Sequence, residues 1–475
     1  MNRYTILAVA CISCCYTACK IPEAVSKTEN KNVPSAFGGA SADTNNLAQI
    51  SWKQYFTDPD LQNLIDTALK NNQELNITLQ EIAISGNEIK ARKGELLPFV
   101  SVGAGAGVEK VGRYTSQGAG DATTEIKPGK EMPDPLPDML LSARATWEID
   151  IWHKLRNAKE AAIKRYLSTI EGRNFLITTL IAEIANSYYE LLALDNQLAI
   201  VQQNIQLQSN ALEIVKIQKE ASKVTELAVR KFEAEVLNTK SMQYELLQQI
   251  AVTENRINFL LGRFPQHIAR NAGTFDAALP SVVHVGIPSQ LLANRPDIKQ
   301  AELDLAAAKL DVKVAKAQFY PSLSISAGIG YNAFSPALLF KTPESMLYSL
   351  AGELAAPLIN KAAIKSAYAN ANYKQIQAVY NYERSILNGY VEVANQLSNI
   401  GNLEKNYEMK SKQVLALTQS IDISNDLFKS ARADYLEVLM TQRDALESKL
   451  ELVETKKQQM NAMVNIYQAL GGGWN

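Results

Sequence analysis

The sequence predicts a mainly α-helical protein with two pairs of β-strands, in which one arrangement of elements occurs twice along the chain. The first observation is a seven-residue spacing of apolar residues at 177–212 that returns at 386–421. The second is a constant offset, because Gly262 and Gly471 lie 209 positions apart (471 − 262), as these two segments do. The third is an alternation of apolar with small or polar residues ahead of each helical region. Together these patterns indicate a tandem duplication.

Two long helical hairpins are expected, at 155–262 and 362–470. Any insertion would rotate an apolar seam away from its partner, so a register held without a gap indicates one duplicated hairpin. A second seam in the first arm, at Leu194, Val201 and Val215, completes the spacing of a coiled coil. The polar residues between the seams either form a solvated face or line a water-filled duct, and the spacing is compatible with both.

Strand pairs are expected at 99–152 and 322–358, each preceded by a helix. In the first pair, apolar residues from Val100 onward alternate with serine and glycine, the pattern of a membrane strand with one apolar face. The helix before it is expected over 59–97, ended by Pro98. Four strands cannot close a barrel, and lipid does not tolerate unpaired strand edges. Either the strands form a small soluble sheet, or several chains combine them.

Each repeat therefore has the order helix, strand, loop, strand, long helix, long helix. The first repeat is assigned to 51–270 and the second to 271–475. After the N-terminal segment no run of eighteen apolar residues occurs, so no transmembrane helix is expected there.

The N-terminal part has the features of a lipoprotein export signal. Residues 1–18 are interpreted as the signal peptide, and residues 19–50, rich in Ser, Asn, Lys and Gly, as a flexible tether. The segment Tyr16-Thr17-Ala18-Cys19 is similar to a bacterial lipobox, in which Cys19 receives the lipid, although Tyr16 stands where leucine is usual. The alternative is an ordinary signal peptide with incidental cysteines. No cofactor is expected beyond the covalent lipid on Cys19.

Composition and motifs exclude several other functions. The chain has 48 basic and 49 acidic residues and a net charge of −1, which gives no support to nucleic-acid binding. Its three histidines are scattered, and no paired-cysteine metal motif or nucleophile-elbow motif is present. The glycines at 103, 105 and 107 alternate as in a strand and lack the lysine of a phosphate loop. We therefore expect neither an enzyme nor a metal site.

Several short motifs occur in a fixed order over almost the whole chain: Trp52-x-x-x-Phe56-x-Asp58-Pro59-x-Leu61, Trp147-Glu148-Ile149-Asp150-Ile151-Trp152, Leu260-Leu261-Gly262-Arg263, Gly286-Ile287-Pro288, Arg295-Pro296-Asp297-Ile298, Phe319-Tyr320-Pro321-Ser322 and Ala469-Leu470-Gly471-Gly472-Gly473-Trp474. This set resembles the TolC-type outer-membrane efflux proteins, in their NodT-like lipoprotein branch. Each motif alone is weak, and the ordered set is specific.

The resemblance implies a homotrimer whose twelve strands form an outer-membrane β-barrel and whose long helices form a periplasmic α-barrel. It implies the passive exit duct of a tripartite efflux pump for drugs, toxic compounds or metals. The partners would be a periplasmic adaptor protein, an inner-membrane RND-type pump and outer-membrane lipid. The alternatives are the outer-membrane channel of a type I protein-secretion system and a periplasmic coiled-coil lipoprotein without a pore.

In this family the hairpin tips form the periplasmic gate, which places the tips here at 221–226 and 430–435. The candidate gate and tip residues are Glu437, Asp434, Arg432, Phe428 and Lys223. In a trimer each charged residue would become a ring of three that selects ions by its field. The alternatives are that Asp434 caps a helix and that Glu437 lies on a solvated face.

The offset of 209 pairs Glu437 with Ala228 and Asp434 with Thr225, so acidic groups are expected at one tip and not at the other. The family usually has glycine where this chain has Ser222 at the first tip, and Ala431 at the second.

Elsewhere the chain has His153 where glycine is frequent in the family. Trp147 and Trp152 are candidate membrane-interface aromatics, with packing against neighbouring segments as the alternative. Arg295-Pro296-Asp297 is interpreted as a structural turn at a helix start.

Overall fold

A computed structural model of the protein describes residues 21–23, 25, 27–37, 45–276, 284–357, 359, 361–430 and 432–474. The signal peptide at 1–18, the lipid site Cys19 and the tip residue Ala431 lie outside the described residues. The chain divides into two compact units, and each unit contains segments of both sequence repeats. We call them the strand unit, which includes Ala83–Leu167 and Leu303–Val379, and the hairpin unit, which includes Ser168–Glu302 and Tyr380–Asn475.

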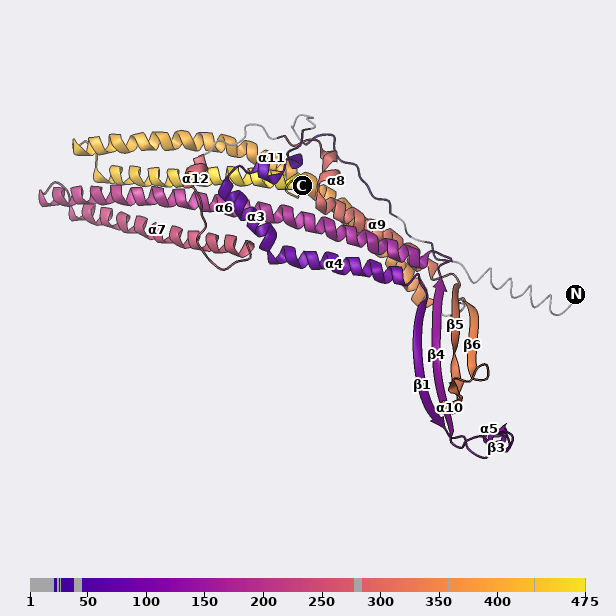
Figure 1. Cartoon of the computed structure of the whole chain (residues 1–475). Helices are drawn as coiled ribbons and strands as arrows, with labels where there is room; N and C mark the ends of the chain where they lie inside the picture. The colour runs from indigo at the N-terminus through magenta and orange to yellow at the C-terminus, as the bar shows by residue number, and fades with distance from the viewer. Residues whose placement is uncertain are drawn as a thin grey trace. The chain divides into compact units, whose positions relative to one another are not determined.

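In the strand unit, four antiparallel strands form one sheet in the order β1-β4-β5-β6 (Figure 1). The strands are β1 (Phe99–Glu109), β4 (Leu136–Ile149), β5 (Ser322–Ala333) and β6 (Met346–Ala355). Both predicted strand pairs are present, and the last strand lies within about three residues of its expected bounds. The central pairing joins the two repeats, since β4 pairs with β5. Within this sheet β1 and β6 are the edge strands.

The sheet has two chemically different faces, because directly opposite residues of paired strands share a face. On one face Val100 lies opposite Ala145, and Ala145 opposite Ala327. On the other, Gly103 lies opposite Ser142, and Ser142 opposite Gly330. The alternation seen in the sequence therefore continues across all four strands as an apolar face and a polar face.

The loops at the far ends of the strands carry small elements of their own. The first loop contains α5 (Ser116–Asp121) and the paired strands β2 (Glu125–Lys127) and β3 (Lys130–Glu131). The second contains only α10 (Pro336–Leu339).

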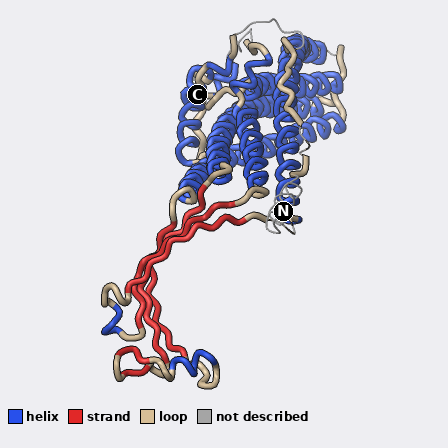
Figure 2. The backbone as a smooth tube through the Cα atoms, turned by 90° about the vertical axis from the view of Figure 1, so that its right-hand side faces the viewer, coloured by secondary structure: helices blue, strands red, loops and turns tan. Residues whose placement is uncertain are grey.

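The long helices (Figures 1 and 2) lie mostly in the hairpin unit, and the first helix of each hairpin begins within the strand unit. The first hairpin consists of α6 (Lys154–Glu220) and α7 (Glu226–Leu260), and the second of α11 (Ala362–Lys429) and α12 (Tyr435–Ala469). Helices α7 and α12 both contain 35 residues and begin 209 positions apart (435 − 226). Among the described residues, no helix is both long and apolar enough to cross a membrane.

Shorter elements connect these parts. They are η1 (Leu47–Gln49), α2 (Trp52–Tyr55), α3 (Pro59–Asn71), α4 (Gln73–Gly94), η2 (Ala272–Asp276), η3 (Pro288–Gln290), α8 (Leu291–Asn294) and α9 (Pro296–Ala317). Helices α4 and α9 both contain 22 residues, and each leads into a strand of the sheet.

The single helix expected over 59–97 is wrong, because the structure breaks it at Asn72 between α3 and α4. Asn72 has a non-helical ψ of 127°, and its side chain bonds in two directions. Its Oδ1 accepts from the Leu75 backbone N–H at 2.9 Å, and its Nδ2 donates to the Leu260 carbonyl at 2.9 Å. The break therefore serves the C-terminal end of α7, which no local pattern in 59–97 reveals.

The end of α12 is held in a comparable way by Arg295. Its Nη1 donates to the Ala469 carbonyl at 2.8 Å and to Glu392 at 2.6 Å. Its Nε and Nη2 donate to both carboxylate oxygens of Asp297. Burial alone would lower the pKa of Arg295, but the hydrogen bonds and negative charges of Asp297 and Glu392 together outweigh it, and the pKa is raised. The residues Arg295-Pro296-Asp297 thus form a structural turn in which a buried cation is fully paired.

Glycine is required directly after each of these helix ends. Gly262 has φ of +67° and Gly471 of +88°. A Cβ on Gly262 would clash with the carbonyl oxygen of Asn71, and one on Gly471 with that of Asn294. The two Leu-Gly motifs are therefore helix C-caps at which another backbone segment packs closely.

The core of the hairpin unit contains a cluster of tyrosines that fixes the segment before α3. Tyr55 and Tyr467 stack with ring centroids 4.2 Å apart. The hydroxyl of Tyr467 donates to the Ile50 carbonyl at 2.7 Å, and that of Tyr188 donates to Asp58 at 3.0 Å. Burial raises the pKa of Tyr467 above its ordinary range, so the hydroxyl stays a donor at neutral pH.

Replacing Tyr467 with phenylalanine is expected to lower the free energy of unfolding by about 1 kcal/mol, because the part-buried hydrogen bond to the Ile50 carbonyl is lost. Thermal unfolding of the purified protein in detergent measures the loss. Tyr114→Phe is the matched control, since Tyr114 is fully exposed. An equal melting temperature for Tyr467→Phe and native protein would contradict the assignment.

Candidate functional site at the hairpin tips

The two turns that join the long helices lie where the sequence predicts the tips. The first turn covers 221–225, between α6 and α7, and the second lies between Lys429 and Tyr435. Both turns belong to the hairpin unit, as do the helical ends on which they are carried.

The first turn holds a serine in a conformation that favours glycine. Ser222 has φ of +58°, and its N–H donates to the Lys219 carbonyl at 2.9 Å. The next N–H, of Lys223, donates to the Gln218 carbonyl at 2.9 Å, which completes a helix C-cap. His153, in the strand unit, also has φ of +58°. Glycine is usual in the family at both positions, and this chain has the left-handed backbone conformation there without glycine.

Ion pairs that were not predicted from the sequence connect the two helices at the first tip. Lys219, in the last turn of α6, lies 2.8 Å from Glu226 at the start of α7, so this pair spans the turn. The guanidinium group of Arg230 forms two further ion pairs, at 2.9 Å from the carboxylate of Glu226 and at 2.8 Å from that of Glu233. The signal was the spacing of Glu226, Arg230 and Glu233 by four and three residues on one helix. The hydrogen bond from Lys219 lowers the pKa of Glu226, and the charge of Arg230 adds to this effect.

The expectation that acidic groups lie at one tip only is therefore wrong in this form, because Glu226 is exposed and Glu233 is half-buried at the first tip. The difference between the tips is pairing. At the first tip the carboxylates are bound by basic residues, whereas the counterparts of Lys219 and Glu226 at the offset of 209 are Phe428 and Tyr435. At these two positions the second tip has aromatic residues, where the first tip has an ion pair.

At the second tip the predicted charged residues are all exposed. Asp434 occupies the N-cap position of α12, but its side chain makes no capping hydrogen bond. Glu437 lies in the first turn of α12, and Arg432 lies in the turn itself, where its N–H donates to the Leu427 carbonyl. Phe428 is half-buried, and Lys223 at the first tip is exposed. No side-chain hydrogen bond therefore supports the capping alternative for Asp434. The gate roles of these residues remain predictions.

The pairing of Glu437 with Ala228 has a packing reason. Ala228 is fully buried in a small apolar cluster near the first tip, with Val215, Phe232 and Leu439. Tyr435 packs against the same cluster from the second hairpin. A carboxylate at 228 would be buried without a partner, so alanine is the residue that this position accommodates.

In the strand unit, the two interface candidates make specific backbone contacts. The Nε1–H of Trp147 donates to the Leu96 carbonyl at 3.1 Å, and that of Trp152 donates to the Pro321 carbonyl at 2.6 Å. Trp152 also stacks on Tyr320, with ring centroids 4.7 Å apart. Both rings remain partly exposed. The contacts support the packing alternative, and a membrane-interface role stays a prediction.

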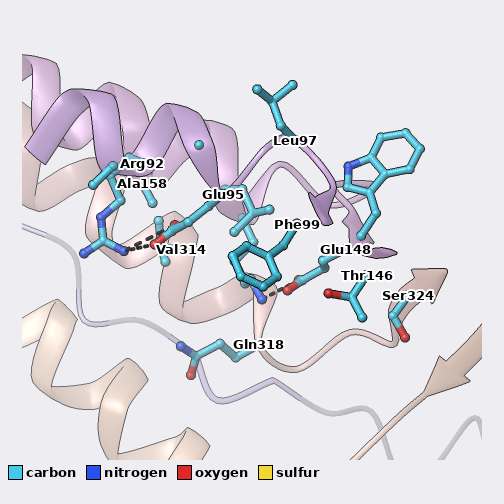
Figure 3. A pocket seen from close by; sticks show the side chains of 15 residues that line it. Arg92, Glu95, Leu97, Phe99, Thr146, Glu148, Ala158, Val314, Gln318 and Ser324 are labelled. Carbon is cyan, nitrogen blue, oxygen red and sulfur yellow. Dashed lines mark hydrogen bonds and ion pairs between the residues drawn. The ribbon is translucent and has the colours of Figure 1, made fainter. Parts of the chain in front are cut away.

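A cavity of about 860 Å³ lies beside Trp147 and is lined from α4, β1, β4, α6 and α9 (Figure 3). Its charged residues are paired: Arg92 contacts Glu95 at 3.1 Å, and Lys154 contacts Glu148. The described residues contain no cluster of three or more histidine, cysteine or carboxylate side chains that could bind a metal ion.

Comparison with known proteins gives the family. The family described as outer membrane efflux protein matches residues 64–263 and 287–472 of the chain. The pyoverdine export outer membrane protein OpmQ of Pseudomonas aeruginosa is 27% identical over 442 residues, covering 93% of this chain and 91% of OpmQ. The toluene efflux pump outer membrane protein TtgI of Pseudomonas putida is 27% identical over 436 residues, covering 89% of this chain and 87% of TtgI.

Solved structures have the same fold. The open state of the MtrE outer membrane channel of Neisseria gonorrhoeae matches with a TM-score of 0.81 at 22% identity, over 96% of this chain and 98% of MtrE. The chain belongs to the outer membrane efflux protein family. Its expected location in the outer membrane and its resemblance to the TolC-type channels are thereby confirmed. The family consists of channel-type efflux proteins, which agrees with the non-enzymatic interpretation of the sequence.

Replacing Ser222 with glycine is expected to raise the stability of the first tip by up to about 1 kcal/mol, because glycine tolerates the positive φ. The control is Ser241→Gly on the exposed face of α7, where glycine is expected to destabilise the helix by roughly 0.5 kcal/mol. Thermal unfolding in detergent measures both. A loss of stability of the same size at both sites would show that the turn imposes no strain.

Lowering the pH is expected to loosen the first tip and not the second. The pKa of Glu226 is lowered from its ordinary value of 4.5, so its stabilising effect is present above that value. It is lost as the pH falls through the lowered value. A nitroxide label at Lys223→Cys should gain mobility over this range, and a label at Ala433→Cys should not. Equal changes at both labels would refute a role for the Glu226 ion pairs.

Proposed function

We propose that this outer membrane efflux protein is the passive exit duct of a tripartite efflux system, assembled as a homotrimer and anchored by a lipid on Cys19. The supporting observation is the four-stranded sheet with an apolar face and two edge strands, β1 and β6. Unpaired backbone groups at these edges are not tolerated in lipid, whereas pairing with the edges of further copies would satisfy them. Three copies are the number that the resemblance to TolC-type proteins implies, giving a barrel of twelve strands.

In the same assembly the long helical hairpins would lie side by side and form the wall of an α-barrel. We infer that the two hairpins arose by tandem duplication, which is supported by the equal lengths of α7 and α12 and by the equal lengths of α4 and α9. A helical wall built from three chains would contain two kinds of tip in alternation. The duct hypothesis accounts for the sheet, which a structural coiled-coil rod would not need.

The second tip is the better candidate for the gate. Within the part of the chain that the structure describes, its exposed charges Glu437, Asp434 and Arg432 have no ion-pair partners of the kind that neutralise Glu226 at the first tip. In a trimer, Glu437 would form a ring of three carboxylates at the entrance of the duct, with a field that favours cations. A periplasmic adaptor and an inner-membrane RND-type pump are the proposed partners, and the hairpins would splay at their tips to open the duct.

The cargo is proposed only by class. The relatives include proteins named for pyoverdine export and toluene efflux, so small molecules of different polarity are compatible with this fold. We propose a small-molecule efflux role, with drugs, toxic compounds or metals as the candidate substrates.

Single-channel conductance in a planar bilayer tests both the duct and the gate. Native protein should conduct, and Glu437→Ala should shift the reversal potential in a KCl gradient toward anions, because three negative charges are lost. Glu447→Ala is the matched control, since Glu447 is exposed on the same helix but lies ten residues beyond Glu437. A native protein without conductance would refute the duct. A conducting Glu437→Ala variant with native selectivity would refute only the gate.

A further inference from the structure

Arg144, near the middle of β4, is the only basic residue on the four strands of the sheet. It lies on the polar face, opposite Ser101 of β1 and Gly328 of β5, and the next residue across is Ser349 of β6. Arg144 is exposed. A long cationic side chain in the middle of a membrane-type strand requires a polar environment, so its position needs an explanation.

The surroundings of Arg144 are almost free of side-chain bulk. Gly103 and Gly105 on the neighbouring strand face open space, because a Cβ added to either glycine would have no other atom within 4 Å. Serine hydroxyls at 101 and 349 supply hydrogen-bonding groups at the same level of the sheet. The residues around Arg144 on the polar face are therefore mainly glycine and serine, which leave room for a solute to approach the guanidinium group.

The acidic residues of this face lie at other levels. Glu148 and Glu353 are both opposite Ser324, four residues along β4 from Arg144, which corresponds to about 13 Å. Glu148 is also paired with Lys154. Toward the loops, Asp138 lies six residues away, about 20 Å, and accepts a hydrogen bond from Asn332. Within the described residues Arg144 has no carboxylate at ion-pair distance.

We propose that Arg144 is a selectivity-determining residue of the duct, which attracts solutes bearing carboxylate, sulfonate or phosphate groups. The inference rests on the proposed trimer, in which the polar face of the sheet lines the water-filled interior. The three guanidinium groups of a trimer then form a positively charged ring. This ring is separated along the strands from a negatively charged ring formed by Glu353. Arg144 supplies the charge, and the hydroxyls of Ser101 and Ser349 are additional donors to an anionic oxygen.

The test measures local electrostatics without relying on the gate. A Ser101→Cys variant, with its thiol opposite Arg144, is reconstituted in vesicles and treated with methanethiosulfonate reagents that carry either a sulfonate or a trimethylammonium group. The ratio of the anionic to the cationic modification rate should fall roughly tenfold when Arg144→Gln is added. Arg144→Lys should restore most of the ratio, because the charge returns.

A second position separates failure of this inference from failure of the proposed duct. Val100→Cys lies on the apolar face, and lipid should protect it from both reagents. If Val100→Cys is modified as fast as Ser101→Cys, the proposed barrel is wrong. If Val100→Cys is protected but Arg144→Gln leaves the ratio at Ser101→Cys unchanged, the barrel stands and the role of Arg144 is refuted. The native protein without an added cysteine controls for other thiols.

Discussion

The hairpin unit depends on how the last carbonyl groups of α7 and α12 are satisfied. These helix ends are packed closely against other backbone, and a buried carbonyl without a donor costs about 1–3 kcal/mol. Asn72 supplies the donor at Leu260, and Arg295 supplies it at Ala469. In each case the donor interrupts a helical path, and a new helix of 22 residues begins directly after it.

The two tips differ in chemistry, although the helices that follow them, α7 and α12, have the same length. The first tip keeps its turn with a serine at positive φ and an ion pair across the turn, both of which restrict movement of the helix ends. The second tip has aromatic residues in place of that ion pair, and Tyr435 anchors it on the apolar cluster of the first hairpin. The exposed charges Arg432, Asp434 and Glu437 of the second tip are therefore the candidates for the proposed gate.

The sheet is governed by a different constraint, which is that its two faces must suit two different solvents. Valine, alanine and leucine cover one face, and glycine and serine cover the other. An isolated sheet of this kind would leave two hydrogen-bonding edges and one apolar face in water, an arrangement that favours association. The family to which the chain belongs forms channels in the outer membrane, where such faces and edges are used. Arg144 on the polar face is consistent with a water-filled interior.

The sequence by itself determined the features that repeat along the chain. Heptad spacing predicted the hairpins to within about two residues, and alternation predicted both faces of the sheet, because each pattern reflects burial at the period of its own element. Only the tertiary structure decided where contacts between distant segments override local preference. The break at Asn72 exists for a carbonyl 188 residues away, which the helical pattern of 59–97 does not contain. Likewise Asp434 has the residue type and position of a helix cap but makes no capping bond, because a side chain's partners are set by packing as well as by sequence position.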